Sequence, residues 1–192
     1  MLLAVIFQIG VTLYNSHFDV EYQLTCASRI SVMILIGIPL EVAHGTPQIS
    51  VFYFICLFYT QAVGDILNKY YELFENDSTA FSLVCLHFTN ILKNWQDFPY
   101  KYQRLTLMFL LVLPLEFCKV YDYCNTFYWR WLLFHQTCSL AGCLTGFLLG
   151  YCWIYRPKEE ETDTKIELKN LAIIIGSMII FASVTKLSGL HY

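Results

Sequence analysis

Several polar residues that could do chemistry in this 192-residue sequence lie inside or beside apolar segments. Glu116 and Lys119 are three residues apart, and His87 and Asn90 have the same spacing. On a helix such residues share one face, so Glu116 and Lys119 can form an ion pair. The sequence contains no His-Glu-x-x-His metal motif and no Gly-x-Ser-x-Gly nucleophile motif. We therefore interpret Glu116 and Lys119 as an ion pair and His87 and Asn90 as hydrogen-bonding partners between helices, with no metal site and no cofactor.

Small residues recur on one face of a later apolar segment. Ser139, Gly142, Gly146 and Gly150 follow one another at intervals of three, four and four residues. Glycine has no side chain to keep a neighbouring helix away, so this spacing is typical of close helix packing in membranes. The pattern predicts that a second helix lies directly against Gly142, Gly146 and Gly150.

Glu41 and Gly45 lie where an earlier apolar segment ends. The run His44-Gly45-Thr46-Pro47 is a strong stop signal, because glycine permits a positive φ and proline cannot continue a helix. A carboxylate at a membrane helix end is costly unless it is paired or hydrated. We expect Glu41 and Gly45 to define the turn between two helices.

The composition indicates a membrane protein. Hydrophobic residues make up 57% of the chain and charged residues only 14%, with a mean hydropathy of +0.50. A soluble domain carries about a quarter charged residues. The net charge of −3, with scattered basic residues, excludes a nucleic-acid binder driven by charge. The expected partners are membrane lipids and other integral membrane proteins, with no small-molecule substrate.

The apolar pattern predicts an all-α polytopic helical bundle with about six to seven transmembrane helices. Each span needs about 20 residues, and the chain is predicted to be a single transmembrane domain over 1–192. A charged linker is predicted at 156–168, before an extra C-terminal helix. The predicted segments are 1–14, 27–43, 49–69, 78–94, 103–119, 127–155 and 169–187.

The order of these features resembles the rhomboid superfamily over about residues 17–155. A helix ends in Glu41-Val42-Ala43-His44-Gly45, Ser78 opens a later helix, and Ser139 begins the glycine-rich face. Ser78 lies 37 residues after Glu41, and Ser139 lies 61 residues after Ser78. The resemblance implies a helical membrane scaffold built for intramembrane serine proteolysis.

The same resemblance implies that the catalytic residues are vestigial. The family's histidine falls on Ser139, and its Gly-x-Ser-Gly motif falls on Asn76-Asp77-Ser78-Thr79, where both glycines are lost. A serine nucleophile needs a general base, and Ser139 cannot supply one. His135, one turn before Ser139, is the only candidate substitute base. Asn76 also begins a glycosylation sequon.

The first functional hypothesis is an inactive rhomboid-like protein that binds transmembrane segments of partners or clients and is not an enzyme. Its expected location is the endoplasmic reticulum or Golgi. An alternative is a structural subunit of a large membrane complex, for example in the mitochondrial inner membrane. A third is an active intramembrane serine protease that uses Ser78 and His135.

Overall fold

A computed structural model describes residues 6, 20–67, 78–126, 129–154 and 164–187. All the secondary structure in these ranges is helical, which confirms the all-α prediction. Apart from residue 6, the predicted first segment lies outside the described residues. The same is true of Asn76 and of most of the predicted charged linker.

The first described helical segment is continuous over three parts. These are α2 (Val20–Val32), the π-helical turn η1 (Met33–Gly37) and α3 (Ile38–His44). Within the described ranges, Leu24–His44 is the one helix that is long and apolar enough to cross a membrane by length and composition. Shorter apolar stretches occur at Thr46–Tyr59 and Ala172–Phe181. The number of six to seven spans therefore remains a prediction.

The later helices follow the predicted order. The helix at 78–94 ends within one residue of its predicted bound, whereas the helices at 103–119 and 169–187 are longer than predicted. The backbone hydrogen bonds of a helix form at polar residues as well as at apolar ones. Hydropathy therefore underestimates the length of a helix. The bounds are α4 (Thr46–Leu67), α5 (Ser78–Lys93), α6 (Lys101–Thr126), α7 (Trp129–Leu149), η2 (Gly150–Ile154) and α8 (Thr164–Leu187).

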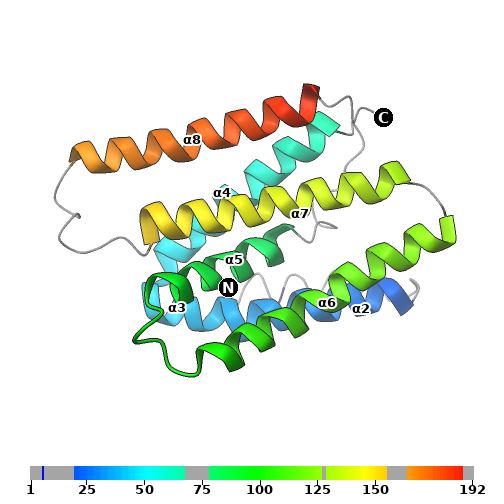
Figure 1. Cartoon of the computed structure of the whole chain (residues 1–192), viewed down its shortest axis with the longest axis horizontal. Coiled ribbons are helices and arrows are strands. Elements are labelled where there is room, and N and C mark those ends of the chain that lie inside the picture. The colour runs from blue at the N-terminus through cyan, green and yellow to red at the C-terminus, as the bar shows by residue number, and fades with distance from the viewer. Residues whose placement is uncertain (1–5, 7–19, 68–77, 127–128, 155–163, 188–192) are drawn as a thin grey trace.

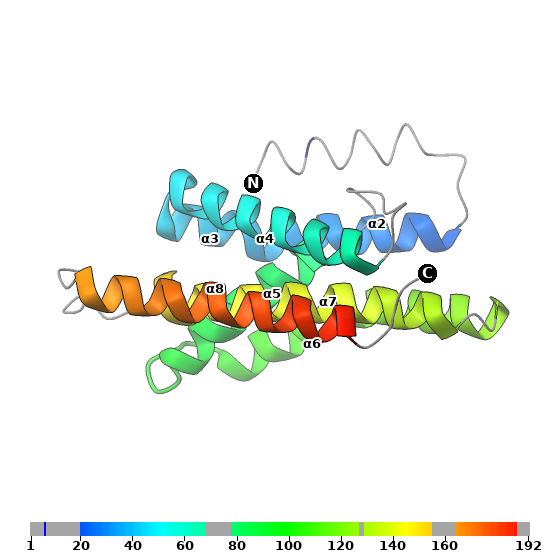
Figure 2. The same ribbon diagram turned by 90° about the horizontal axis from the view of Figure 1, so that it is seen from above.

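Helix α5 lies at the centre of the bundle. It contacts α2, η1 and α4 on one side and α6, α7 and η2 on the other (Figure 2). Every residue from Ser78 to Val84 is buried. Helix α8 packs along α4 and α7 at the edge of the bundle (Figure 1). The first half of α5 is therefore enclosed by neighbouring helices.

Two side-chain hydrogen bonds connect outer helices across the bundle. The Ser28 hydroxyl of α2 donates to the Leu111 carbonyl of α6 at 2.8 Å. Pro114 lies inside α6 and has no N–H for the carbonyl four residues earlier, so Ser28 bonds at a point where the helix is locally weakened. The Tyr59 hydroxyl of α4 donates to the Met178 carbonyl of α8 at 3.2 Å. In lipid the hydrophobic effect does not drive helices to associate, so hydrogen bonds of this kind help to hold them together.

Candidate functional site

The predicted glycine face of α7 lies against the backbone of α5. A Cβ atom added at Gly142 would lie 2.8 Å from the carbonyl carbon of Ser78 and 2.9 Å from its Cα. A Cβ at Gly146 would meet Ser82 at the same two distances. These separations are shorter than any real Cβ contact. The two helix backbones are therefore in direct contact at both glycines.

Gly150 continues this contact into η2. A Cβ added there would lie 2.9 Å from Leu86 Cδ1 and 3.1 Å from Thr89 Cβ, so its neighbours are side chains instead of backbone. Contacts advance along α5 and α7 in the same direction, which makes the two helices parallel. We call this line of contact the α5–α7 seam. It comprises Ser78, Ser82, Gly142, Gly146 and Gly150.

Ser82 connects the two helices by a hydrogen bond. Its hydroxyl lies 2.9 Å from the Gly142 carbonyl on α7 and 2.8 Å from the Ser78 carbonyl on its own helix. The bond to α7 is possible because Gly142 lets the two backbones approach so closely. Sequence reasoning did not single out Ser82, and only the spacing Ser78–Ser82 could have indicated it.

The structure brings both vestigial serine positions to one end of the seam. Ser78 is the first residue of α5, is fully buried, and faces Gly142. Ser139 lies one turn before Gly142 on α7 and is 4% exposed. Both serines are therefore enclosed at the same end of the parallel pair of helices.

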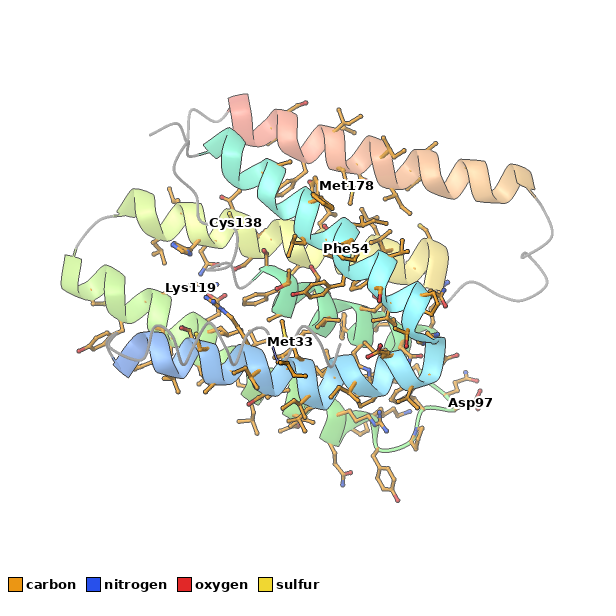
Figure 3. All side chains as sticks on the ribbon, turned by 180° about the vertical axis from the view of Figure 1, so that it is seen from behind. Met33, Phe54, Asp97, Lys119, Cys138 and Met178 are labelled. Carbon is orange, nitrogen blue, oxygen red and sulfur yellow. The ribbon has the colours of Figure 1, made fainter. Side chains whose placement is uncertain are left out.

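A buried polar cluster surrounds Ser139. The Lys119 Nζ of α6 donates to Ser139 Oγ at 2.7 Å and lies 2.9 Å from Glu116 Oε1. The same ammonium is 4.6 Å from the centre of the Phe81 ring on α5. The Gln136 amide of α7 donates to the other Glu116 oxygen. Figure 3 shows Lys119 between α6 and the part of α7 that carries Cys138.

The predicted ion pair of Glu116 and Lys119 is confirmed. Its connection to Ser139 was missed, because the spacing along one helix does not reveal which other helix the pair faces. Lys119 is only 3% exposed, whereas the side chain of Glu116 is 33% exposed. We call Glu116, Lys119, Gln136 and Ser139 the Lys119 cluster.

His135 lies away from the level of Ser78 along α7. It precedes Gly142, the residue that contacts Ser78, by seven residues. Seven residues correspond to about 10 Å along a helix axis. A general base must lie within about 3 Å of the nucleophile. The α7 residue that comes to this end of the seam is Ser139, and it accepts a hydrogen bond from Lys119.

Glu41 and Gly45 form the predicted turn, which lies away from the α5–α7 seam. Gly45 has a φ of 87°, a conformation that disfavours residues with a Cβ, and its N–H donates to the Glu41 carbonyl at 2.8 Å. The adjacent His44 borders a cavity together with Asn90, near the C-terminal end of α5. Glu41 and Gly45 are therefore not brought together with Ser78, which begins α5.

Among the described residues, His87 and Asn90 do not form the predicted hydrogen bonds to another helix. Asn90 Oδ1 accepts from the Asn94 amide at 2.7 Å, four residues further along the same chain segment. The His87 ring packs edge-on against Phe98 at 5.9 Å. In the part of the chain that the structure describes, no group of three or more His, Cys, Asp or Glu residues could hold a metal ion.

Comparisons with known proteins find rhomboid-related relatives. The chain is 22% identical over 142 residues to rhomboid-related protein 1 of Caenorhabditis elegans, covering 70% of this chain and 37% of the relative. It is 22% identical over 134 residues to rhomboid-related protein 3 of mouse and of human, covering 64% of this chain and 31% of each relative. The chain thus spans about a third of the length of these relatives. No family model and no solved structure matches. The chain is thus similar at low identity to rhomboid-related proteins over about two thirds of its length, and the secondary structure of its described residues is helical.

Proposed function

We propose that this protein is a rhomboid-like membrane protein that does not hydrolyse peptide bonds and that binds transmembrane segments of partner proteins. The Lys119 cluster is the observation that supports the absence of peptide-bond hydrolysis. The residue that would supply a base beside Ser78 is Ser139, and its hydroxyl accepts a hydrogen bond from an ammonium group.

Lys119 does not replace the missing base. The Lys119 amine lies 2.9 Å from Glu116 Oε1, donates to Ser139 Oγ at 2.7 Å and faces the Phe81 ring. These contacts engage the amine as a hydrogen-bond donor and as one partner of an ion pair. Electrostatic attachment of α6 to α7 is the role that this arrangement supports.

The outer face of α6 supports the proposed binding of transmembrane segments of partner proteins. Glu116 is partly exposed there, and Leu113, Phe117 and Val120 beside it are 45%, 59% and 49% exposed. An ionisable residue inside a membrane is a functional candidate, because hydrogen bonds between helices drive association in lipid. A partner helix with a polar residue could pack on these apolar side chains and donate to Glu116.

The absence of proteolysis is tested with a serine-reactive fluorophosphonate probe on the full chain in membranes. We expect no labelling above that of a Ser78→Ala variant, because the position of the family's histidine holds Ser139, whose hydroxyl accepts a hydrogen bond from Lys119. Labelling of Ser78 that disappears in His135→Ala would contradict the proposal and would favour the active protease.

Partner binding is tested with a photo-crosslinking residue at Leu113, and at Ile180 on the outer face of α8 as the control. Ile180 is 65% exposed. We expect protein adducts at Leu113 that exchange during a chase with excess unlabelled transmembrane segment. Partners retained in fixed stoichiometry would favour the structural-subunit alternative. Lipid adducts alone at both positions would contradict partner binding on this face. The endoplasmic reticulum or Golgi remains the predicted compartment.

A further inference from the structure

A cavity of about 320 Å³ lies between α3, α5 and α6, near the C-terminal end of α5. Its polar lining comes from His44, His87, Asn90 and Arg104. Ser78 begins α5 and the cavity lies near its last turns, so this cavity is separate from the Lys119 cluster and the vestigial serines. Nothing in the proposed function uses it.

The rest of the lining is apolar. Ile36, Leu40 and Met108 are buried and form its inner wall. Leu35 and Leu107 also line it and are 49% and 40% exposed, so the apolar wall continues onto the outer surface of the bundle. A space with an apolar wall that reaches the lipid-facing surface suits a hydrocarbon chain.

Arg104 is the single permanently charged side chain that lines this cavity among the described residues. Its guanidinium lies 5.1 Å from the Phe98 ring, which also contacts His87, so the aromatic ring holds the cation beside the cavity. No lining residue is Asp or Glu, and Asp97, at this end of the bundle in Figure 3, is not in the lining. The cavity therefore favours an anionic ligand, and guanidinium groups bind phosphate well.

The surroundings have the composition of a membrane interface. Lys101 lies 4.7 Å from the Trp95 ring and donates to the Trp95 carbonyl at 2.9 Å, and Tyr102 packs edge-on against Trp95. Trp and Tyr gather at the level of lipid headgroups, together with basic residues whose charge reaches water. Arg104 is thus placed where the phosphate of a phospholipid lies.

From this geometry we propose that the cavity binds an anionic glycerophospholipid from the adjacent leaflet. The phosphate binds to Arg104, with His87 and Asn90 available as further hydrogen-bonding groups. One acyl chain lies along Ile36, Leu40 and Met108. The lipid fills the space between α3 and α6 and contacts both helices.

The test measures lipid retention on the full-length protein by native mass spectrometry from micelles. The protein is supplied with equimolar phosphatidylglycerol and phosphatidylcholine of identical acyl chains. We expect wild-type protein to retain phosphatidylglycerol preferentially, and Arg104→Gln to retain it about tenfold less, as expected for the loss of a charged hydrogen bond. Lys101→Gln is the matched control. It removes a cation at the same end that does not line the cavity, and we expect a change of less than about twofold.

A second variant tests the apolar wall. Met108→Trp fills the cavity and is expected to lower retention of phosphatidylglycerol, whereas Leu110→Trp, on the exposed face of α6, is expected to leave it unchanged. Equal loss in Arg104→Gln and Lys101→Gln would overturn the proposal, because binding would then follow general surface charge. Equal retention of the two lipids by the wild-type protein would also overturn it. A folding failure of Met108→Trp leaves the comparison between Arg104→Gln and Lys101→Gln decisive.

Discussion

Lys119 shows how one buried charge is stabilised by neighbours on three helices. Its amine contacts Glu116 on its own helix, Ser139 on α7 and the Phe81 ring on α5. A buried ion pair is costly to form, yet removal of one partner is also destabilising, because the remaining charge is left uncompensated. The cluster therefore ties α6 to the α5–α7 seam.

A double-mutant cycle tests this coupling. We expect Lys119→Met and Glu116→Gln each to lower the free energy of unfolding, by less than the roughly 3–5 kcal/mol of a fully buried pair, because Glu116 is partly exposed. The double variant should lose less than the sum of the single losses. The measurement is denaturant unfolding in detergent, with Lys169→Met on the exposed surface of α8 as the control. Additive losses would contradict an ion pair that matters for stability.

At the scale of the elements, the parallel pair α5 and α7 depends on glycine. Gly142 and Gly146 place backbone against backbone, and the carbonyl of Gly142 then lies within reach of the Ser82 hydroxyl. This arrangement fixes the position of α7 along α5. It thereby determines which residue of α7 lies beside Ser78.

Gly142→Ala and Gly176→Ala form a matched pair that tests this contact. Both substitutions add one methyl group within a helix. At Gly142 it would lie 2.8 Å from the Ser78 carbonyl carbon, whereas at Gly176 it would meet no atom of another described segment within 4 Å. We expect Gly142→Ala to lower the free energy of unfolding by about 1–3 kcal/mol through overpacking. Gly176→Ala should be neutral or slightly stabilising, because alanine has the higher helix propensity. Equal stability of the two variants would mean that α5 and α7 are not in backbone contact.

At the scale of the whole molecule, the predicted membrane span near residues 103–119 remains a prediction, and the length of α6 is compatible with it. The helix has 26 residues, which corresponds to about 39 Å. The hydrocarbon core of a bilayer is about 30 Å thick. Helix α6 is therefore long enough to span even though polar residues lie within it, including Glu116 and Lys119.

Cysteine labelling tests this arrangement in sealed vesicles. Cys124 is exposed near the C-terminal end of α6, and Gln96 is exposed in the loop before its N-terminal end. Two variants are compared, one that keeps only Cys124 and one whose only cysteine is introduced by Gln96→Cys. A membrane-impermeant maleimide should label these two variants from opposite sides of the membrane. Unsealed vesicles are the control, because both sites should then react. Labelling of both from one side would show that α6 does not cross the membrane.

Features that depend on spacing within one helix could be predicted from the sequence. The helical class followed from apolar runs, the ion pair from the separation of Glu116 and Lys119, and the small-residue face from the recurrence of Gly142 and Gly146. All of these follow from the fixed 3.6-residue turn of the α-helix, which relates neighbours along the chain to neighbours in space.

Only the tertiary structure determined which helices meet. Nothing local to the sequence places Lys119 beside Ser139, which is 20 residues away, or brings Arg104 and His44 to one cavity. Contacts between helices depend on how every helix face is buried at once, and on the small residues that set how closely two axes approach. The resemblance to rhomboid proteins indicated that a base is missing at Ser139. The packing of α6 against α7 decided that an ammonium group lies there instead.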